Sequence, residues 1–149
     1  MRKAGFLIVL YLCSCQFLTC HRKDFSEAQR IVEQIVARHP EIVRLTIHAV
    51  PSGEEKNRII ASNIHAKIGK YSDPEDIEAM KTRKTVVLRE GSNLDVTAPI
   101  LDKADIAIAA AGITLTFPTN TTEVALVKKA GDIAQELTAS TRAAKRPLW

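Results

Sequence analysis

The sequence IVRLTIHAVPSGEEKNRIIAS, residues 42–62, has the pattern of two β-strands joined by a turn. In residues 42–50, side chains expected to face the core alternate with side chains expected to face the other way: Val43, Leu45, Ile47 and Ala49 against Arg44, Thr46 and His48. A period of two is that of a strand with one buried face. The turn lies at 51–53, and residues 58–62 form a second, short strand. Because the connection is short, we expect the two strands to pair antiparallel as a hairpin.

Helical patterns lie on both sides of this hairpin and at the end of the chain. Residues 24–39 carry apolar side chains at helical spacing, and the proline that follows ends the helix. A short helix runs from Ser72 to about Met80, with Ile77 and Met80 expected to face inward. A last helix with one apolar face spans about 121–139.

Three further strands are expected between the second and third helices, at 85–88, 94–101 and 106–117. In the last of them the alternation slips at 109–112, which predicts a bulge or a close backbone approach near Gly112. The order of elements predicts an α+β fold. It has a five-stranded antiparallel sheet, a long N-terminal helix, a short helix between the second and third strands, and a C-terminal helix.

Residues 1–20 have the layout of a secretory signal peptide. Arg2 and Lys3 precede an apolar run at 5–12, and no acidic residue occurs before Asp24. That run is far shorter than the roughly 20 residues that span a bilayer. We therefore expect export, and an extracytoplasmic location that is periplasmic or secreted.

The cysteines all lie in or at the end of this segment. The predicted folded domain, 22–140, contains none, and neither does the basic tail at 141–149, so no disulfide holds the domain. Leu-Cys-Ser-Cys ending at Cys15 resembles a bacterial lipobox, and the four residues ending at Cys20 are a poorer version. One reading is lipidation of Cys15 or Cys20, with membrane contact only through that anchor. The other is cleavage near Cys20 with a soluble product.

Composition excludes several classes of function. Without the two basic residues of the signal segment, 19 basic side chains face 17 acidic ones, and aromatic residues make up 5% of the chain, so a nucleic-acid partner is not expected. No nucleophile elbow, phosphate-binding loop or dinucleotide glycine motif occurs, so we expect no catalytic residue and no enzyme activity. The four histidines have no metal-ligand spacing, which predicts no metal site and no cofactor.

The order of elements and one local motif resemble the Cache (PAS-like) extracytoplasmic sensor domains. The motif is Ile-Ile-Ala-Ser-Asn at 59–63, then Ile-Gly-Lys at 68–70, then Asp73. Arg83 stands where such domains commonly have glycine, and the turn at 103–105 also lacks its usual glycine. The resemblance covers about residues 25–117. It implies a ligand pocket on the sheet, roofed by loops between the second and third strands, and a signal handed to a membrane or envelope protein partner.

On such a fold the resemblance places a set of ligand-binding candidates around the pocket: Lys70, Tyr71, Met80, Arg83, Asp95 and Thr97. Lys70 and Arg83 can pair with a ligand carboxylate, and Asp95 can accept from an amine. The function predicted is binding of a small metabolite, such as a carboxylate or amino acid, without catalysis. In the alternative, these residues are solvated charges and core, and the protein is a structural or interaction component of the cell envelope with a filled pocket.

Overall fold

The computed structural model describes residues 26–149, which fold as one five-stranded antiparallel sheet with helices on both faces. The strand order is β2-β1-β5-β4-β3. The elements follow in this order: α1 (Glu27–Arg38), β1 (Ile42–Ala49), β2 (Arg58–Ser62), the short 3-10 helix η1 (His65–Lys67), α2 (Pro74–Thr82), β3 (Val86–Glu90), β4 (Asn93–Leu101), β5 (Ala107–Thr116) and α3 (Glu123–Ala143). The predicted α+β class, the five strands and the three helices are confirmed. The predicted signal peptide, with Cys15 and Cys20, lies outside the described residues.

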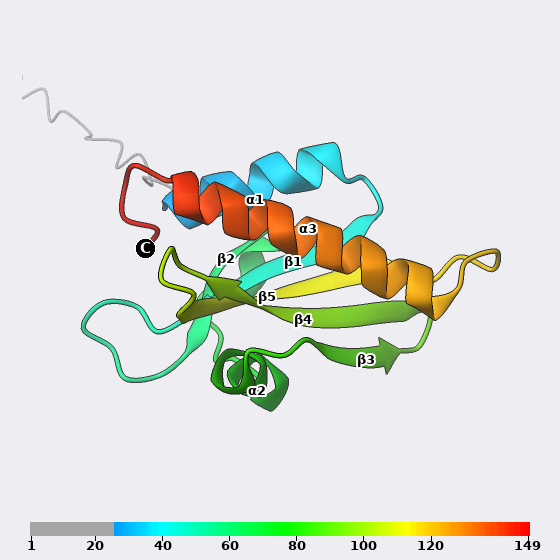
Figure 1. The fold of residues 1–149 in the computed structure, drawn as a ribbon, viewed down its shortest axis with the longest axis horizontal. Helices are drawn as coiled ribbons and strands as arrows, with labels where there is room; N and C mark the ends of the chain where they lie inside the picture. Colours follow the sequence, from blue (N-terminus) through cyan, green and yellow to red (C-terminus); the bar gives the residue numbers. More distant parts are fainter. Residues whose placement is uncertain (1–25) are drawn as a thin grey trace, which may run out of the picture.

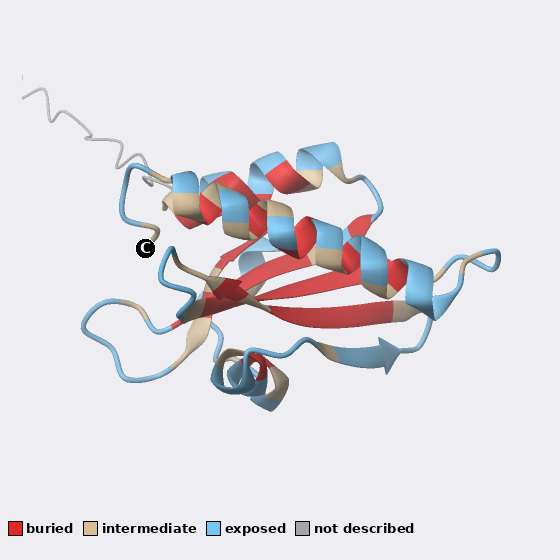
Figure 2. Ribbon diagram, in the orientation of Figure 1, coloured by how far each residue is buried: buried red, intermediate tan, exposed pale blue. Residues whose placement is uncertain are grey.

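The sheet separates two unequal layers (Figure 1). Helices α1 and α3 pack side by side on one face, and the shorter α2 lies on the other, against β3, β4 and β5. The apolar core is between the sheet and the α1–α3 pair, where Figure 2 shows buried residues on both helices and on the central strands. Its largest fully buried side chains include Ile31, Ile35, Leu45, Ile47, Leu94, Ile113, Leu115, Ile133 and Leu137. Each buried side chain of this size contributes roughly 1.5–3 kcal/mol of hydrophobic stabilisation.

A buried glutamine joins α1 to the edge of the sheet. Gln29 is 2% exposed, and its side-chain amide donates to the Ser62 carbonyl at 3.0 Å while its oxygen accepts from the Ser62 N–H at 2.9 Å. The Ser26 hydroxyl caps the same helix by accepting from the Gln29 N–H at 3.2 Å. Helix α1 is thereby fixed in position by backbone groups of β2 that would otherwise be unpaired at the sheet edge.

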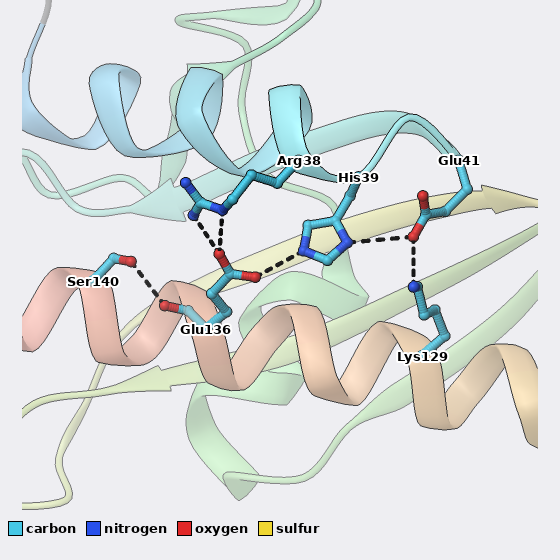
Figure 3. A network of polar contacts seen from close by, with 6 residues as sticks. All are labelled: Arg38, His39, Glu41, Lys129, Glu136 and Ser140. Carbon is cyan, nitrogen blue, oxygen red and sulfur yellow. Dashed lines mark hydrogen bonds and ion pairs between the residues drawn. The ribbon is translucent and has the colours of Figure 1, made fainter.

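A polar network fastens the end of α1 to α3 (Figure 3). Glu136 of α3 accepts from Arg38 Nε at 2.8 Å and lies 2.7 Å from His39 Nε2. His39 Nδ1 lies 3.3 Å from Glu41, which also pairs with Lys129 Nζ at 2.9 Å. The hydrogen bond to His39, with help from Arg38, holds the pKa of Glu136 below its ordinary value. The network therefore stabilises the helix pair most while Glu136 is ionised.

The irregularity of β5 lies away from the predicted position. The ladder between β4 and β5 runs without interruption through Gly112, and the register shift falls between Ile100 and Leu101, opposite Ala107 and Ala109. Gly112 is instead crowded by side chains, because a Cβ there would lie 2.6 Å from the Thr46 hydroxyl oxygen. The prediction of a bulge near Gly112 is therefore wrong, and the close approach it named as the alternative comes from side chains of β1.

Two details of the predicted packing also differ. Val43 is 43% exposed because a register shift between β1 and β5 falls beside it. Ile77 is 38% exposed, and α2 turns Asp76 and Ala79 toward the sheet instead. The proposed boundary between domain and tail at 140–141 falls inside α3, and the chain end folds back so that the Leu148 carbonyl accepts from the Ala28 N–H at 3.0 Å.

Candidate functional site

The sheet face beneath α2 is polar. Strand alternation puts the apolar residues of β1, β4 and β5 against α1 and α3 and leaves their polar residues on the opposite face. Those polar residues are Arg44, Thr46, His48, Asp95, Thr97 and Thr114, and all but Arg44 are 8% exposed or less. Burying such groups is unfavourable unless they are paired, so their partners define what the face can do.

A cavity of about 140 Å³ lies between this face and the first turn of α2. With about 30 Å³ per water molecule, it has room for roughly four or five waters or for a small organic molecule. Its lining comes from β1, β2, η1, α2, β3, β4 and β5: Arg44, Thr46, His48, Ile59, Lys67, Asp73, Glu75, Asp76, Glu90, Asp95 and Gly112.

Arg44 and Asp95 form one wall of the cavity as an ion pair. The Arg44 guanidinium lies 2.9 Å from Asp95 Oδ2, and the Thr114 hydroxyl donates to Asp95 Oδ1 at 2.9 Å. A second carboxylate, Glu90 of β3, lies 3.5 Å from Arg44. Both oxygens of Asp95 are thus occupied, and the charge of Arg44 is shared between two carboxylates.

His48 also lines the cavity and connects β1 to α2. Its Nδ1 lies 2.9 Å from Asp76 Oδ2 and 2.9 Å from the Ser72 hydroxyl, and its Nε2 lies 2.7 Å from the Thr46 hydroxyl. Asp76 also accepts from the Asp73 N–H at 2.9 Å, which closes the first turn of α2. The His48 and Asp76 side chains are 6% and 5% exposed, so this pair fixes α2 over the sheet.

The predicted ligand residues divide into two groups. Asp95 lines the cavity, and Thr97 lies buried on the same face, directly across the β4–β5 ladder from Gly112. Lys70, Tyr71 and Arg83 are exposed and lie outside the cavity lining. Tyr71 is 62% exposed, with Lys56 and Arg58 5.3 and 5.6 Å from its ring centre.

The structure also places Met80 and the backbone of Arg83. Met80 is partly buried, and its sulfur accepts from the Asn57 amide at 3.0 Å. Arg83 ends α2 in a left-handed conformation, with φ 55°. The structure thus assigns Arg83 to a helix end that faces solvent.

Several lining residues belonged to sequence patterns that predict secondary structure but no binding site. Alternation along β1 already separated Arg44, Thr46 and His48 from the core, and Asp73 and Asp76 carry the signature of a helix start. No pattern in the sequence marks Lys67 or Glu90.

A larger, mostly apolar groove of about 490 Å³ runs between α3 and the last residues of β4, past Ala98, Pro99, Gly131 and Thr138. Within residues 26–149, no group of three or more potential metal ligands comes together. In the same range, no helix is both long and apolar enough to cross a membrane.

Comparison with known proteins identifies the fold but no family. No protein-family model matches the chain, and no curated protein matches it. Among solved structures, the nlh2 GAF domain from A. aeolicus, described as in an inactive state, superposes with a TM-score of 0.55 at 11% identity, over 78% of this chain and 96% of that one. An IclR transcriptional regulator from Alicyclobacillus acidocaldarius gives a TM-score of 0.52 at 11% identity, over 78% of this chain and 66% of that one. GAF domains are PAS-like folds, so the chain has a PAS-like α+β fold.

Proposed function

We propose that this protein is a sensor-like domain that binds a small polar ligand, without converting it, in the cavity between the sheet and α2. The carrying observation is the composition of that cavity. A domain with a merely structural role gains most by filling a sheet face with apolar side chains. Here the face under α2 instead holds the Arg44–Asp95 ion pair and the buried contact between His48 and Asp76. Charged and polar pairs of this kind commonly stabilise a fold less than apolar residues of the same size.

The lining is also preorganised for binding. Asp95, Arg44 and His48 are each held by two or more partners, so a ligand meets side chains that have already lost their rotational freedom. Both nitrogens of His48 are engaged within the protein, which favours a positioning role over proton transfer to a ligand.

The similarity to a GAF domain supports the PAS-like part of this proposal. The finer assignment to the Cache domains depends on the 59–73 motif and on the signal-peptide layout of residues 1–20. We propose accordingly that the protein is exported, either secreted or held by a lipid on Cys15 or Cys20. We propose a small carboxylate or amino acid as the ligand class, and an envelope protein as the recipient of the signal.

One observation favours the alternative of a structural or interaction module. Strand β3 is a sheet edge whose Val87 and Leu88 are 37% and 40% exposed, and such an edge can pair with another chain. In that case the charged side chains of the cavity would satisfy one another, and no ligand would bind there.

A thermal-shift screen of the full 149-residue chain against small metabolites, followed by calorimetry, separates these proposals. Binding stabilises the folded state by RT ln(1 + [L]/Kd), about 2.7 kcal/mol at a hundredfold excess over Kd. Lys67→Trp places a bulky ring at the cavity wall and should abolish binding of any hit. Lys70→Trp, on an exposed residue outside the lining, is the matched control.

The variants distinguish three outcomes. Loss of binding in Lys67→Trp alone supports the cavity. Loss in Lys70→Trp alone moves the site to the loop predicted from the sequence. A well-folded protein that binds nothing in the screen contradicts the proposal and favours the interaction module.

A further inference from the structure

The charges around the cavity are unequal. Five carboxylates line it, from Asp73, Glu75, Asp76, Glu90 and Asp95, against two permanent cations, Arg44 and Lys67. His48 adds a third positive charge only when it is protonated. The cavity therefore has a negative excess in either protonation state.

The internal ion pairs do not remove this excess. Arg44 is bound by Asp95 at 2.9 Å and approached by Glu90 at 3.5 Å, so one guanidinium serves two carboxylates. Asp76 is engaged by His48. The Glu75 side chain makes no hydrogen bond or ion pair with a described residue, although Glu75 lies in the cavity wall and is only partly exposed.

The α2 helix offsets a part of the remaining charge. Its N-terminus carries about half a positive charge, and Asp73, Glu75 and Asp76 in the capping position and first turn are placed to interact with it. Three carboxylates exceed what one helix end compensates. A ligand that supplies a positive charge would neutralise the rest in a partly desolvated site, where such an interaction is stronger than in water.

Groups in or near the cavity that lack a partner within the described residues also favour a ligand that donates hydrogen bonds. Thr97 is 3% exposed, and its hydroxyl makes no hydrogen bond with a described residue. It lies outside the cavity lining, across the ladder from Gly112 of the cavity wall. Among the lining cations, Lys67 alone is outside an ion pair with a described residue, so a ligand carboxylate would find one available partner at most.

From this distribution of charge we infer that the cavity selects a small organic cation, bound through a primary amine whose N–H groups donate to the lining carboxylates Glu75 and Glu90. This inference depends on the proposed function, because it names the chemical class of ligand for the same cavity. Of the two ligand classes proposed above, the inference keeps the amino acid, which would bind through its amino group, and replaces the simple carboxylate with a cation.

Calorimetric titration of the full chain with matched probes tests the inference. The probes are primary amines of three to eight non-hydrogen atoms, each beside the carboxylate and the primary amide that carry the same alkyl group. An example is propylamine, butyrate and butyramide, which share a propyl group. We expect the amine to bind at least about tenfold more tightly than its carboxylate, since the charge interaction reverses sign between them. Raising the ionic strength should lower the affinity of the amine, because salt screens the charge interaction.

A pair of variants one helical turn apart locates the interaction. Glu75→Gln removes a lining carboxylate that has no partner within the described residues, and should weaken amine binding about fivefold or more. Glu78→Gln, on the exposed side of α2, should leave it unchanged. Both variants keep the helix and differ from the native residue only in charge.

Each result has one meaning. Amine binding that falls in Glu75→Gln and persists in Glu78→Gln supports the inference. Carboxylate or amide probes that bind as tightly as the amine, or an amine that is insensitive to Glu75→Gln, overturn the amine specificity and leave the binding function standing. Failure of every probe and of the wider metabolite screen overturns the proposed function as well.

Discussion

Replacing Gly112 with alanine is expected to destabilise the protein by closing the space between β5 and β1. The new Cβ would lie 2.6 Å from the Thr46 hydroxyl oxygen and 3.4 Å from His48 Nε2. A Cβ needs about 3.4 Å or more from such an atom, so Thr46 must move by most of an ångström. The clash is with a side chain that is 3% exposed and has little room to retreat.

The magnitude follows from what Thr46 loses when it moves. Its hydroxyl contacts His48 Nε2 at 2.7 Å and the Gly112 carbonyl at 3.3 Å, and each lost hydrogen bond costs about 1 kcal/mol. Overpacking a buried site costs about 1–3 kcal/mol, while replacing glycine restricts the unfolded chain and returns about 0.4–1 kcal/mol. We expect a net loss of about 1–3 kcal/mol in the free energy of unfolding.

Urea unfolding of four chains measures this effect: the native protein, Gly112→Ala, Thr46→Ala and the double variant. Thr46→Ala removes the clashing oxygen, so it should lower the free energy of unfolding less in the Gly112→Ala protein than in the native one. The coupling energy between the two substitutions should be about 1–2 kcal/mol. Gly131→Ala is the matched control, since nothing lies within 4 Å of a Cβ there, and should raise stability by up to about 1 kcal/mol. A Gly112→Ala protein as stable as the native one, or additive single effects, would refute the reasoning.

Three further predictions concern a strained residue, the helix network and the core. Arg83→Gly should stabilise the protein by about 0.5–1 kcal/mol in urea unfolding, because Arg83 has φ 55° and glycine adopts that conformation without strain; a loss of stability would contradict this. Since the pKa of Glu136 is lowered in the folded state, its stabilisation is present above the ordinary carboxyl value of 4.5 and is lost as pH falls through the lowered pKa. The native protein should therefore exceed Glu136→Gln in stability at pH 7, and the gap should close in acid; a gap independent of pH would count against the network. Leu137→Ala should cost about 3–4 kcal/mol, because Leu137 is 0% exposed between α3 and the sheet; a loss under 1 kcal/mol would mean that the core is packed otherwise.

Strand alternation and helical spacing were sufficient to predict the five strands and the three α-helices, although not the 3-10 helix η1. The pattern is clearest in α1, α3, β1, β4 and β5, which bury an apolar face in the core. The same logic failed for α2. It placed Ile77 inward, but this helix covers a polar face, so Asp76 turns inward to His48 and Ile77 is exposed. Inward and apolar coincide only where the neighbouring surface is apolar.

Two positions of the chain have a backbone conformation that usually requires glycine. Arg83 and Asp105, in the segments where Cache-like domains commonly have glycine, are the two non-glycine residues with positive φ among residues 26–149. At the second position the turn is held locally, because the Asp102 carboxylate accepts from the N–H groups of Ala104 and Ile106 at 2.8 and 2.9 Å. The backbone shape therefore persists without the residue that usually permits it. A departure from a family pattern at such a turn is weak grounds for doubting the hairpin.

The cavity could not be predicted to the same extent because its residues come from seven elements and share no sequence spacing. What the sequence did contain was the polar half of the β1 alternation, Arg44, Thr46 and His48, which was assigned only to the face away from the core. In this fold that face is covered by α2 and is largely shielded from solvent. The α1–α3 layer supplies the large apolar core, and α2 is short and held through His48 and Asp76. Substitutions of cavity charges that leave this pair intact, such as Glu75→Gln, should therefore change binding with little effect on unfolding, whereas substitutions in the α1–α3 core should do the reverse.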